Sequence, residues 1–271
     1  MIDFIVLMWK PLLAALILTG IHAYLGFHVI ERKVIFVDLS LAQIAALGAS
    51  VAFLLGYELH TTPAYFFSLM ATFIGAALFA ATRTRAQKVP QEAMIGIVYA
   101  VSAALAILIL SSVPEGDEHI RHMLTGNILL VTGGELWTMA LLYGAVGVFH
   151  WVFRRVFITV STEPGKAFAF GMPVRFWDLL FYLSFGLVVT SSVEIAGVLL
   201  VFTFLIVPSV AAMLLSSNLT ARLWIGWGFG LAASFAGIAG SYVFDLPTGP
   251  TIVCCFGLLF LWVGLLRWKH L

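Results

Sequence analysis

The sequence is poor in charge and in cysteine. Only 10% of its 271 residues are Asp, Glu, Lys or Arg, whereas 62% are hydrophobic. A soluble domain has about 25% charged and about 45–50% apolar residues, so this composition excludes an ordinary soluble protein and indicates a membrane protein. The formal net charge is only +1 and no basic cluster stands out, so we expect no nucleic-acid partner. Cys254 and Cys255 are adjacent in an apolar stretch, which predicts packing residues and not a disulfide framework.

Sequence motifs of several enzyme classes are also missing. Gly165-Lys166 lacks the rest of the G-x-x-x-x-G-K-[ST] phosphate loop, and the sequence has no His-Glu-x-x-His, no G-x-S-x-G and no spaced cysteine ligands. We therefore expect no enzymatic activity and no resident cofactor in this chain. If transport here uses ATP, another polypeptide must bind it. Met1–Trp9 lacks the basic region and cleavage site of a signal peptide, so the first span is expected to be retained.

Long apolar segments make up most of the chain, and each is close to the roughly 20 residues that cross a bilayer. We predict an all-α polytopic membrane protein with a single transmembrane domain over residues 1–271. Met1–Lys10 is predicted to be an interfacial helix, with Pro11 in the first turn of the first span. The boundary between the sixth and seventh of nine spans is poorly marked, so eight spans plus a re-entrant segment fit nearly as well. The predicted spans are Pro11–Ile30, Val34–Gly56, Ala64–Ala81, Gln91–Ser112, Glu135–Phe153, Phe176–Ser192, Ile195–Leu215, Ala221–Val243 and Gly249–Leu266.

The basic residues predict the orientation, because cytoplasmic loops carry an excess of Lys and Arg. Only Lys10 and Arg121 of the 14 Lys and Arg fall outside one set of alternate loops and the C-terminus. We therefore predict that the C-terminus is cytoplasmic and the N-terminus is outside. The residues on the predicted cytoplasmic side are Arg32, Lys33, Arg83, Arg85, Lys88, Arg154, Arg155, Lys166, Arg175, Arg222, Arg267 and Lys269.

The second predicted span, Val34–Gly56, carries Asp38, Ser40 and Gln43 near its start. A carboxylate inside a membrane is expensive without a partner and usually faces a cavity, a pathway or another polar group. Hard oxygen ligands also suit ions such as Mn or Fe. We therefore interpret Asp38 and Gln43 as lining a translocation route. Positions five apart point about 140° away from one another on a helix, so the two share an ion only if the helix bends or two copies meet.

The plainer interpretation is that Asp38 caps the helix start or pairs with Arg32 or Lys33. The outer loop Val113–Gly134 has a similar ambiguity. His119 and His122, at positions i and i+3, fit a divalent ion, but the favoured interpretation is a solvated acidic loop that meets a partner. The acidic residues of this loop are Glu115, Asp117 and Glu118.

Other polar residues receive structural interpretations. Glu194 is more simply explained as a cap at a helix start than as a residue that first contacts a cation entering the pathway. Asp245 begins an Asp-Leu-Pro-Thr-Gly-Pro turn, in which it is expected to cap the following helix. Three histidines on apolar stretches are expected to be packing residues: His22, His28 and His150.

Several stretches, in order, match a known family. They are GFHVIERKVIFVDLSLAQIAALG, EAMIGIVYA, MLTGNILLV, EPGKAFAFGMP, EIAGVLLVFTFLIVPSVAAMLL and SYVFDLPTGPTIV. Together they cover nearly the whole length, and the chain resembles the membrane permease of bacterial zinc/manganese/iron-type ABC importers.

The resemblance implies a multi-pass protein of the bacterial cytoplasmic membrane that moves a divalent metal ion by alternating access. It implies that a second permease copy, two cytoplasmic ATPase subunits that bind ATP and an extracytoplasmic solute-binding protein are partners. The cytoplasmic loop at about residues 154–175 would then hold the coupling helix that seats in the ATPase. The residues that the resemblance assigns to this coupling are Glu163, Pro164, Ala167, Phe168 and Gly171.

The second span departs from the family pattern G-D-A-L-S-H. Anchored on Gly48, the chain places Leu39 where the family has Asp and Gln43 where it has His, and Asp38 is displaced by one position. The change removes an imidazole ligand and leaves a neutral amide oxygen. Three hypotheses follow: a permease for a divalent metal, a permease for a metal chelate such as a siderophore or cobalamin, and an ion-coupled secondary transporter or membrane interaction protein. We find no pair of related halves with broken helices, which many secondary transporters have.

Overall fold

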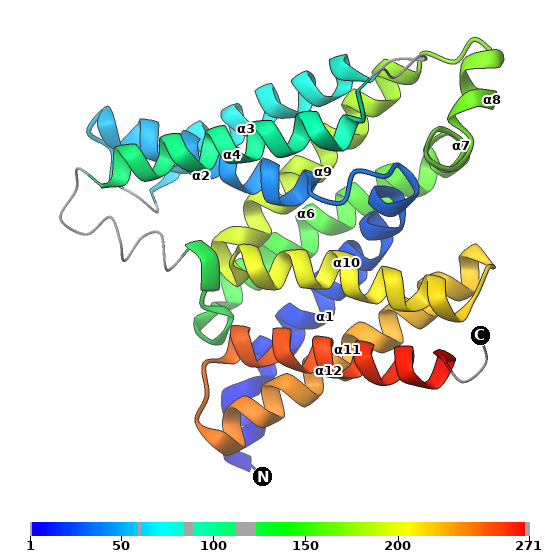
Figure 1. Cartoon of the computed structure of the whole chain (residues 1–271). Helices are drawn as coiled ribbons and strands as arrows, with labels where there is room; N and C mark the ends of the chain where they lie inside the picture. Colours follow the sequence, from blue (N-terminus) through cyan, green and yellow to red (C-terminus); the bar gives the residue numbers. More distant parts are fainter. Residues whose placement is uncertain (1, 59–60, 84–88, 112–122, 269–271) are drawn as a thin grey trace. The chain divides into compact units, whose positions relative to one another are not determined.

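The computed structural model describes residues 2–58, 61–83, 89–111 and 123–268, and its regular elements are helices (Figure 1). The predicted all-α class is therefore confirmed. In chain order the elements are α1 (Ile2–Glu31), α2 (Val37–Leu54), α3 (Thr62–Thr82), α4 (Gln91–Leu110), η1 (Ile128–Leu130), α6 (Gly133–Val152), α7 (Arg154–Thr162), α8 (Pro164–Ala169), α9 (Val174–Ala196), α10 (Val198–Leu215), α11 (Leu219–Phe244) and α12 (Thr248–Trp268).

Eight of these helices are long and apolar enough to cross a membrane, within the part of the chain that is described. A ninth span arises if α6 and α7, which are bent by 77° at their junction, are counted together. The eight-or-nine-span prediction is thus confirmed. Apolar side chains are exposed on the surface of the helices. On α4, for example, Ile97 and Leu108 are 59% and 68% exposed. Such exposure along a whole helix is unfavourable in water but favourable against lipid.

The structure decides two helix boundaries that the sequence left open or predicted differently. Gly197, with φ +76°, separates α9 from α10, so the sixth and seventh predicted spans are distinct helices. Pro11, in contrast, lies inside α1, which runs unbroken from Ile2 to Glu31. The predicted interfacial helix ending before Pro11 is therefore wrong. A proline is tolerated inside a membrane helix because neighbouring groups re-satisfy the backbone carbonyl that it frees, and the apolar run on both sides continues the helix.

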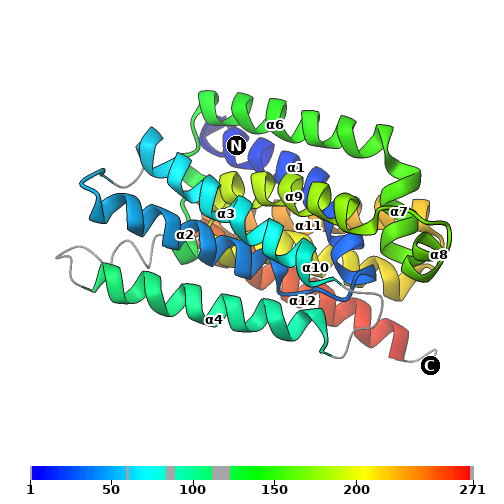
Figure 2. The same cartoon turned by 90° about the horizontal axis from the view of Figure 1, so that it is seen from above.

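The chain divides into two compact units, each formed from several stretches. The first unit comprises residues 1–30, 124–145 and 194–271. Within it, α10, α11 and α12 pack against one another (Figure 2). A Cβ at Gly237 of α11 would lie 2.5 Å from the Cα of Ile252 in α12, so the missing side chain lets these two backbones approach closely. The Ser209 hydroxyl of α10 also donates a hydrogen bond to the Ala23 carbonyl of α1, at 3.2 Å.

The second unit comprises residues 31–123 and 146–193. In it α2 packs against both α3 and α4 (Figure 1). Gly48 sets the distance between α2 and α3, because a Cβ there would lie 2.5 Å from the Phe67 carbonyl oxygen and 2.8 Å from the Ser68 Cα. This unit contains the start of α2, where the sequence predicted the translocation route, and the α7–α8 region, where it predicted the coupling helix. The grouping of all residues into one transmembrane domain stays a prediction.

Candidate translocation and coupling sites

Asp38 lies in the first turn of α2 and is only 2% exposed. Its Oδ1 atom is buried and has no hydrogen-bond partner among the described residues. The predicted alternative partner Arg32 instead forms an ion pair with Asp178. The helix N-terminus favours a negative charge, but a buried carboxylate oxygen without a partner still costs free energy. Asp38 therefore presents an acceptor that a cation or a proton would satisfy.

Gln43 is also buried, at 6% exposure, and so is Ser40. Helix α2 is unbroken from Val37 to Leu54, so Asp38 and Gln43 project about 140° apart. Gln43 shares a face with Ser40, three residues earlier, and the Ser40 hydroxyl oxygen is buried with no hydrogen-bond partner among the described residues. The start of α2 thus carries polar groups on two faces, and one copy of the chain does not direct Asp38 and Gln43 at the same ion.

A second carboxylate at the start of α2 was missed by the sequence analysis. Glu92, in the first turn of α4, accepts a hydrogen bond from the Phe36 backbone N–H at 3.0 Å. Phe36 is the N-cap residue directly before Val37, the first residue of α2, so Glu92 fixes the position of the helix that carries Asp38. The sequence signal was the acidic residue that follows Pro90 and Gln91 at the start of an apolar span.

The predicted cytoplasmic loop contains two helices. The nine-residue α7 (Arg154–Thr162) was not predicted, whereas α8 (Pro164–Ala169) lies where the resemblance placed a short coupling helix, in a stretch of the sequence framed by Pro164 and Pro173. Helix α7 packs against α8. Val160 of α7, Ala167 of α8 and Val174 at the start of α9 form a buried cluster, against which Phe168 packs. The α8 helix is thereby held on a small apolar core and is not a free loop.

Helix α8 ends in a pair of backbone hydrogen bonds that require its glycine. The Gly171 N–H donates to the Phe168 carbonyl at 3.2 Å, and the Met172 N–H donates to the Ala167 carbonyl at 3.0 Å. This is the Schellman pattern, in which the residue after the helix takes a left-handed conformation. Gly171 has φ +69°, so a residue with a Cβ would be strained there. The role that this geometry gives Gly171 is to terminate α8.

The two faces of α8 differ in exposure. Ala167 is completely buried and Phe168 is partly buried. Phe170 is 79% exposed, and Glu163 forms an exposed ion pair with Lys166 at 2.7 Å. Of the five predicted coupling residues, Glu163 and Gly171 are therefore exposed and Pro164 is partly so. Phe170 is an outward-facing aromatic residue that the prediction omitted.

A buried ion cluster lies next to α7 and was also missed. Asp178 of α9 accepts hydrogen bonds through Oδ1 from Arg32 and Arg83, with 2.8 Å to the Arg83 Nη1 atom. Its side chain and that of Arg32 are fully buried. The Arg32 guanidinium also lies 4.0 Å from the centre of the Phe181 ring. Burial lowers the pKa of Arg32 from its ordinary value, and the Asp178 carboxylate acts against this shift. The sequence signal was a lone Asp inside the sixth predicted span.

The remaining polar predictions have mixed outcomes. His119, His122 and the acidic residues Glu115, Asp117 and Glu118 lie outside the described residues. Glu194 lies in the last turn of α9, so its predicted role as a cap at a helix start is wrong. The helix start that was expected nearby falls at Val198, after the Gly197 break.

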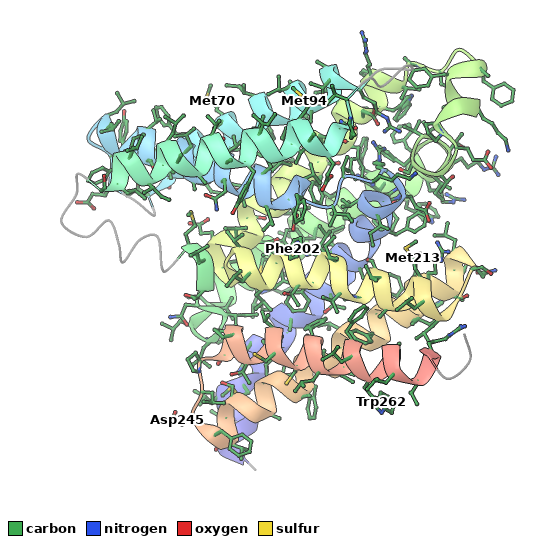
Figure 3. The ribbon with its side chains drawn as sticks, viewed as in Figure 1. Met70, Met94, Phe202, Met213, Asp245 and Trp262 are labelled. Carbon is green, nitrogen blue, oxygen red and sulfur yellow. The ribbon has the colours of Figure 1, made fainter. Side chains whose placement is uncertain are left out.

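Asp245 ends one helix and does not begin the next. It is the C-cap of α11, in the left-handed conformation with φ 51° (Figure 3), which Asp tolerates better than most residues. Helix α12 begins at Thr248, whose hydroxyl hydrogen-bonds with that of Ser241 at 2.8 Å. The expectation that Asp245 caps the following helix is therefore wrong. His22, His28 and His150 are all buried, as packing residues are expected to be.

A cavity of about 490 Å³ lies in the first unit. It is lined by Met213, Leu214, Leu215, Ser216, Ser217, Arg222 and Arg267. The Arg267 guanidinium donates to the Leu215 carbonyl at 3.0 Å, and Arg222 donates to the Ser216 carbonyl at 2.8 Å. These arginines satisfy carbonyls at the end of α10, where a positive charge is favoured. Helix α12 also exposes Trp262, at 60%, on the side away from α10 (Figure 3).

No three His, Cys, Asp or Glu side chains gather into a group that could hold a metal ion in the part of the chain that is described. The arrangement instead defines a helical multi-pass membrane protein with a buried, unpaired carboxylate and a short, partly exposed helix between spans. The model of the ABC 3 transport family matches residues 5–267, and the chain belongs to this family. It is a permease subunit of a bacterial ABC transporter and not itself the catalytic subunit. Membership implies an ATPase partner and a binding-protein partner.

Curated relatives align along nearly the whole chain. The manganese transport system membrane protein MntC of Listeria innocua is 26% identical over 252 residues, which are 93% of this chain and 87% of that protein. A probable iron transport system membrane protein of Haemophilus influenzae is 25% identical over 246 residues, 91% of this chain and 88% of that protein. Because the chain belongs to the ABC 3 transport family, the secondary-transporter hypothesis is set aside.

Solved structures share the fold. A chain of PsaBC from Streptococcus pneumoniae, solved in complex with Fab, superimposes with a TM-score of 0.77 at 24% identity and covers 97% of this chain and 95% of that chain. An inward-facing putative metal-chelate type ABC transporter gives a TM-score of 0.70 at 19% identity and covers 96% of this chain and 85% of that chain. These likenesses confirm the multi-helix membrane fold.

Proposed function

We propose that the chain is the permease of an ATP-driven importer of divalent metal ions, with Asp38 on the translocation route. The observation that carries this proposal is the buried Asp38 carboxylate with an unpartnered Oδ1 atom. A mobile divalent cation would offset its desolvation, and an oxygen ligand suits Mn or Fe. The names of the relatives, a manganese transport protein and a probable iron transport protein, support the same cargo class.

Gln43 enters the proposal through a second copy of the chain. Because Asp38 and Gln43 diverge on one unbroken helix, they approach a common ion only if two copies contribute. We therefore infer a homodimer whose route lies between the copies. Alternating access would expose the route first to a binding protein outside and then to the cytoplasm, as rigid bodies rotate.

The orientation proposed from the basic residues places α8 in the cytoplasm. Arg32, Arg83 and α7 meet within one unit of the structure, which supports placing the loops that carry them on one side of the membrane. Helix α8 then faces the ATPase, with one ATPase subunit for each permease. Its exposed residues Glu163, Lys166 and Phe170 are the proposed contacts, because exposed aromatic residues often anchor interfaces.

The cargo is tested with the permease, its ATPase and its binding protein reconstituted in lipid vesicles. Uptake of Mn, Zn and Fe is measured, both as free ions and as chelates, together with the metal content of the purified complex. We expect ATP-dependent uptake of a free ion. Uptake of the chelate alone would favour the metal-chelate hypothesis, which the amide of Gln43 in place of an imidazole also favours.

The route is tested with Asp38→Asn. We expect lower uptake and normal assembly, because the amide retains the size of the carboxylate but not its charge. The matched control is Ser50→Ala in the same helix, since among the described residues the Ser50 hydroxyl donates its hydrogen bond to the Ala46 carbonyl in the preceding turn of α2. Parental uptake by both Asp38→Asn and Gln43→Ala, at normal membrane abundance, would contradict the assignment of the route.

A further inference from the structure

The cluster of Arg32, Arg83 and Asp178 is unusual in its charge balance. Two guanidinium groups share one carboxylate oxygen, and the side chains of Arg32 and Asp178 are fully buried while that of Arg83 is 7% exposed. Desolvating three charges costs more than such pairs commonly return, and apolar replacements of the same volume are often as stable. Stability alone therefore does not account for placing these charges in the interior.

The same two arginines also hold α7. The Arg32 Nε atom donates to the Ser161 hydroxyl at 2.9 Å, and the Arg83 Nη2 atom donates to the Val160 carbonyl at 3.1 Å. Ser161 and Val160 are in the last turn of α7, which ends one residue before Glu163 at the start of α8. Val160 also packs on Ala167 of α8. A displacement of α8 is therefore passed to α7 by packing and from α7 to the arginines by hydrogen bonds.

The cluster contains a spare donor and a spare acceptor. The Arg32 Nη2 atom and the Asp178 Oδ2 atom are both buried without a hydrogen-bond partner among the described residues. A small shift of either group would exchange one hydrogen-bond pairing for another, so the cluster has the components of a two-arrangement element. Arg32 directly follows α1, and only five residues separate it from Asp38. A change in its pairing would therefore reach the start of α2.

We propose that Arg32, Arg83 and Asp178 are positioning residues that transmit movement of α8 to the start of α2. This inference rests on the proposed function, in which α8 contacts the ATPase and Asp38 lies on the route. When the ATPase displaces α8, α7 moves with it and pulls on the two guanidinium groups. The cluster then shifts between pairings at Asp178, and the α2 segment that carries Asp38 follows.

The first test is Ser161→Ala, which removes one bond between α7 and the cluster and leaves both bonds to Asp178. Its matched control is Thr159→Ala, because the Thr159 hydroxyl donates to the Arg155 carbonyl within α7. The complete transporter is reconstituted with ATPase and binding protein, and ATP hydrolysis and manganese uptake are measured together. We expect Ser161→Ala to lower the uptake per ATP hydrolysed about tenfold, the lower end of the range for losing one hydrogen bond to a charged group. Thr159→Ala is expected to match the parent.

The second test separates transmission from folding. The triple variant Arg32→Met, Arg83→Met and Asp178→Leu replaces the charges with apolar side chains, a type of exchange that commonly preserves stability. We expect it to assemble with the ATPase and to retain its unfolding temperature, while stimulation of ATP hydrolysis by the binding protein is lost. A purely structural role would leave that stimulation intact.

Failure of this inference and failure of the proposed function give different experimental results. Parental coupling in either Ser161→Ala or the triple variant would overturn the inference, whatever the cargo. Absence of manganese uptake by the parental complex would contradict the proposed cargo instead. In that case the stimulation of ATP hydrolysis by the binding protein, compared between parent and variants, still decides whether the cluster transmits movement.

Discussion

Glu92 at the start of α4 accepts a hydrogen bond from the backbone N–H of Phe36, with 3.0 Å between the Oε1 and N atoms. This contact joins two residues that are 56 positions apart in the sequence and lie at the starts of two different helices, α2 and α4. It fixes the point at which α2 begins and hence the position of Asp38. The geometry of the proposed route therefore depends on a residue outside α2.

Exchanging Glu92 tests this contact. Glu92→Ala removes the acceptor, and we expect the free energy of unfolding to fall by about 0.5–1.5 kcal/mol. Glu92→Gln retains a side-chain oxygen that accepts the same bond, so it is expected to unfold near the parental temperature. The measurement is thermal unfolding of the purified protein in detergent. Equal losses in the two variants would mean that the charge, and not the bond to Phe36, is what stabilises this end of α2.

Removing Arg83 tests the energetics of the ion cluster. Arg83→Met leaves Asp178 with one cation and the Val160 carbonyl without its guanidinium donor. We expect a loss of about 1.5–3 kcal/mol in the free energy of unfolding, because charged hydrogen bonds to Asp178 and to the Val160 carbonyl are lost, while Arg32 still balances the charge of Asp178. The control is Arg175→Met: Arg175 is exposed, and within the described part of the chain its side chain donates a single long bond, 3.4 Å, to the Arg83 carbonyl. Its effect is expected to stay within about 0.5 kcal/mol.

The pair Phe168 and Phe170 tests which face of α8 contacts the ATPase. Phe170 is 79% exposed, so Phe170→Ala is expected to leave the unfolding temperature unchanged and to weaken association with the ATPase. Phe168 packs on the cluster of Val160 and Ala167, so Phe168→Ala is expected to cost about 1–3 kcal/mol of stability. Co-purification of the ATPase and thermal unfolding are measured for both. A Phe170→Ala variant that retains the ATPase fully would exclude this residue from the interface.

The departure of α2 from the family pattern provides a test of cargo binding. In the double variant Leu39→Asp and Gln43→His, the chain regains an Asp and a His four residues apart, which share a helix face. Imidazole and carboxylate are better ligands for Mn and Zn than a neutral amide. We expect the KM for manganese uptake to fall about tenfold, within the range for improved ligation. The control Gln43→Asn retains an amide, and an equal KM in both variants would remove α2 from the metal route.

The apolar segments of the sequence determined the membrane class and nearly all of the spans, because crossing a bilayer needs a run of about 20 apolar residues whatever the neighbours are. The stretch framed by Pro164 and Pro173 likewise predicted a short helix between spans, since proline favours the first turn of a helix. Local signals failed where neighbours override them. Pro11 lies inside α1 and not at its start, and Glu194 lies in the last turn of α9 and not at the start of a helix. In both places the apolar run on either side determines the extent of the helix more than the single residue does.

Only the tertiary structure decided which charges meet. Asp178 is separated from Arg32 by 146 residues and from Arg83 by 95. The periodicity of apolar residues shows which segments are helices, but in a chain this uniformly apolar it carries little information about which helices are neighbours. The polar start of α2 could be read from the sequence, whereas the anchor of that helix on Glu92 and the connection of α7 to Asp178 exist only once the helices are packed.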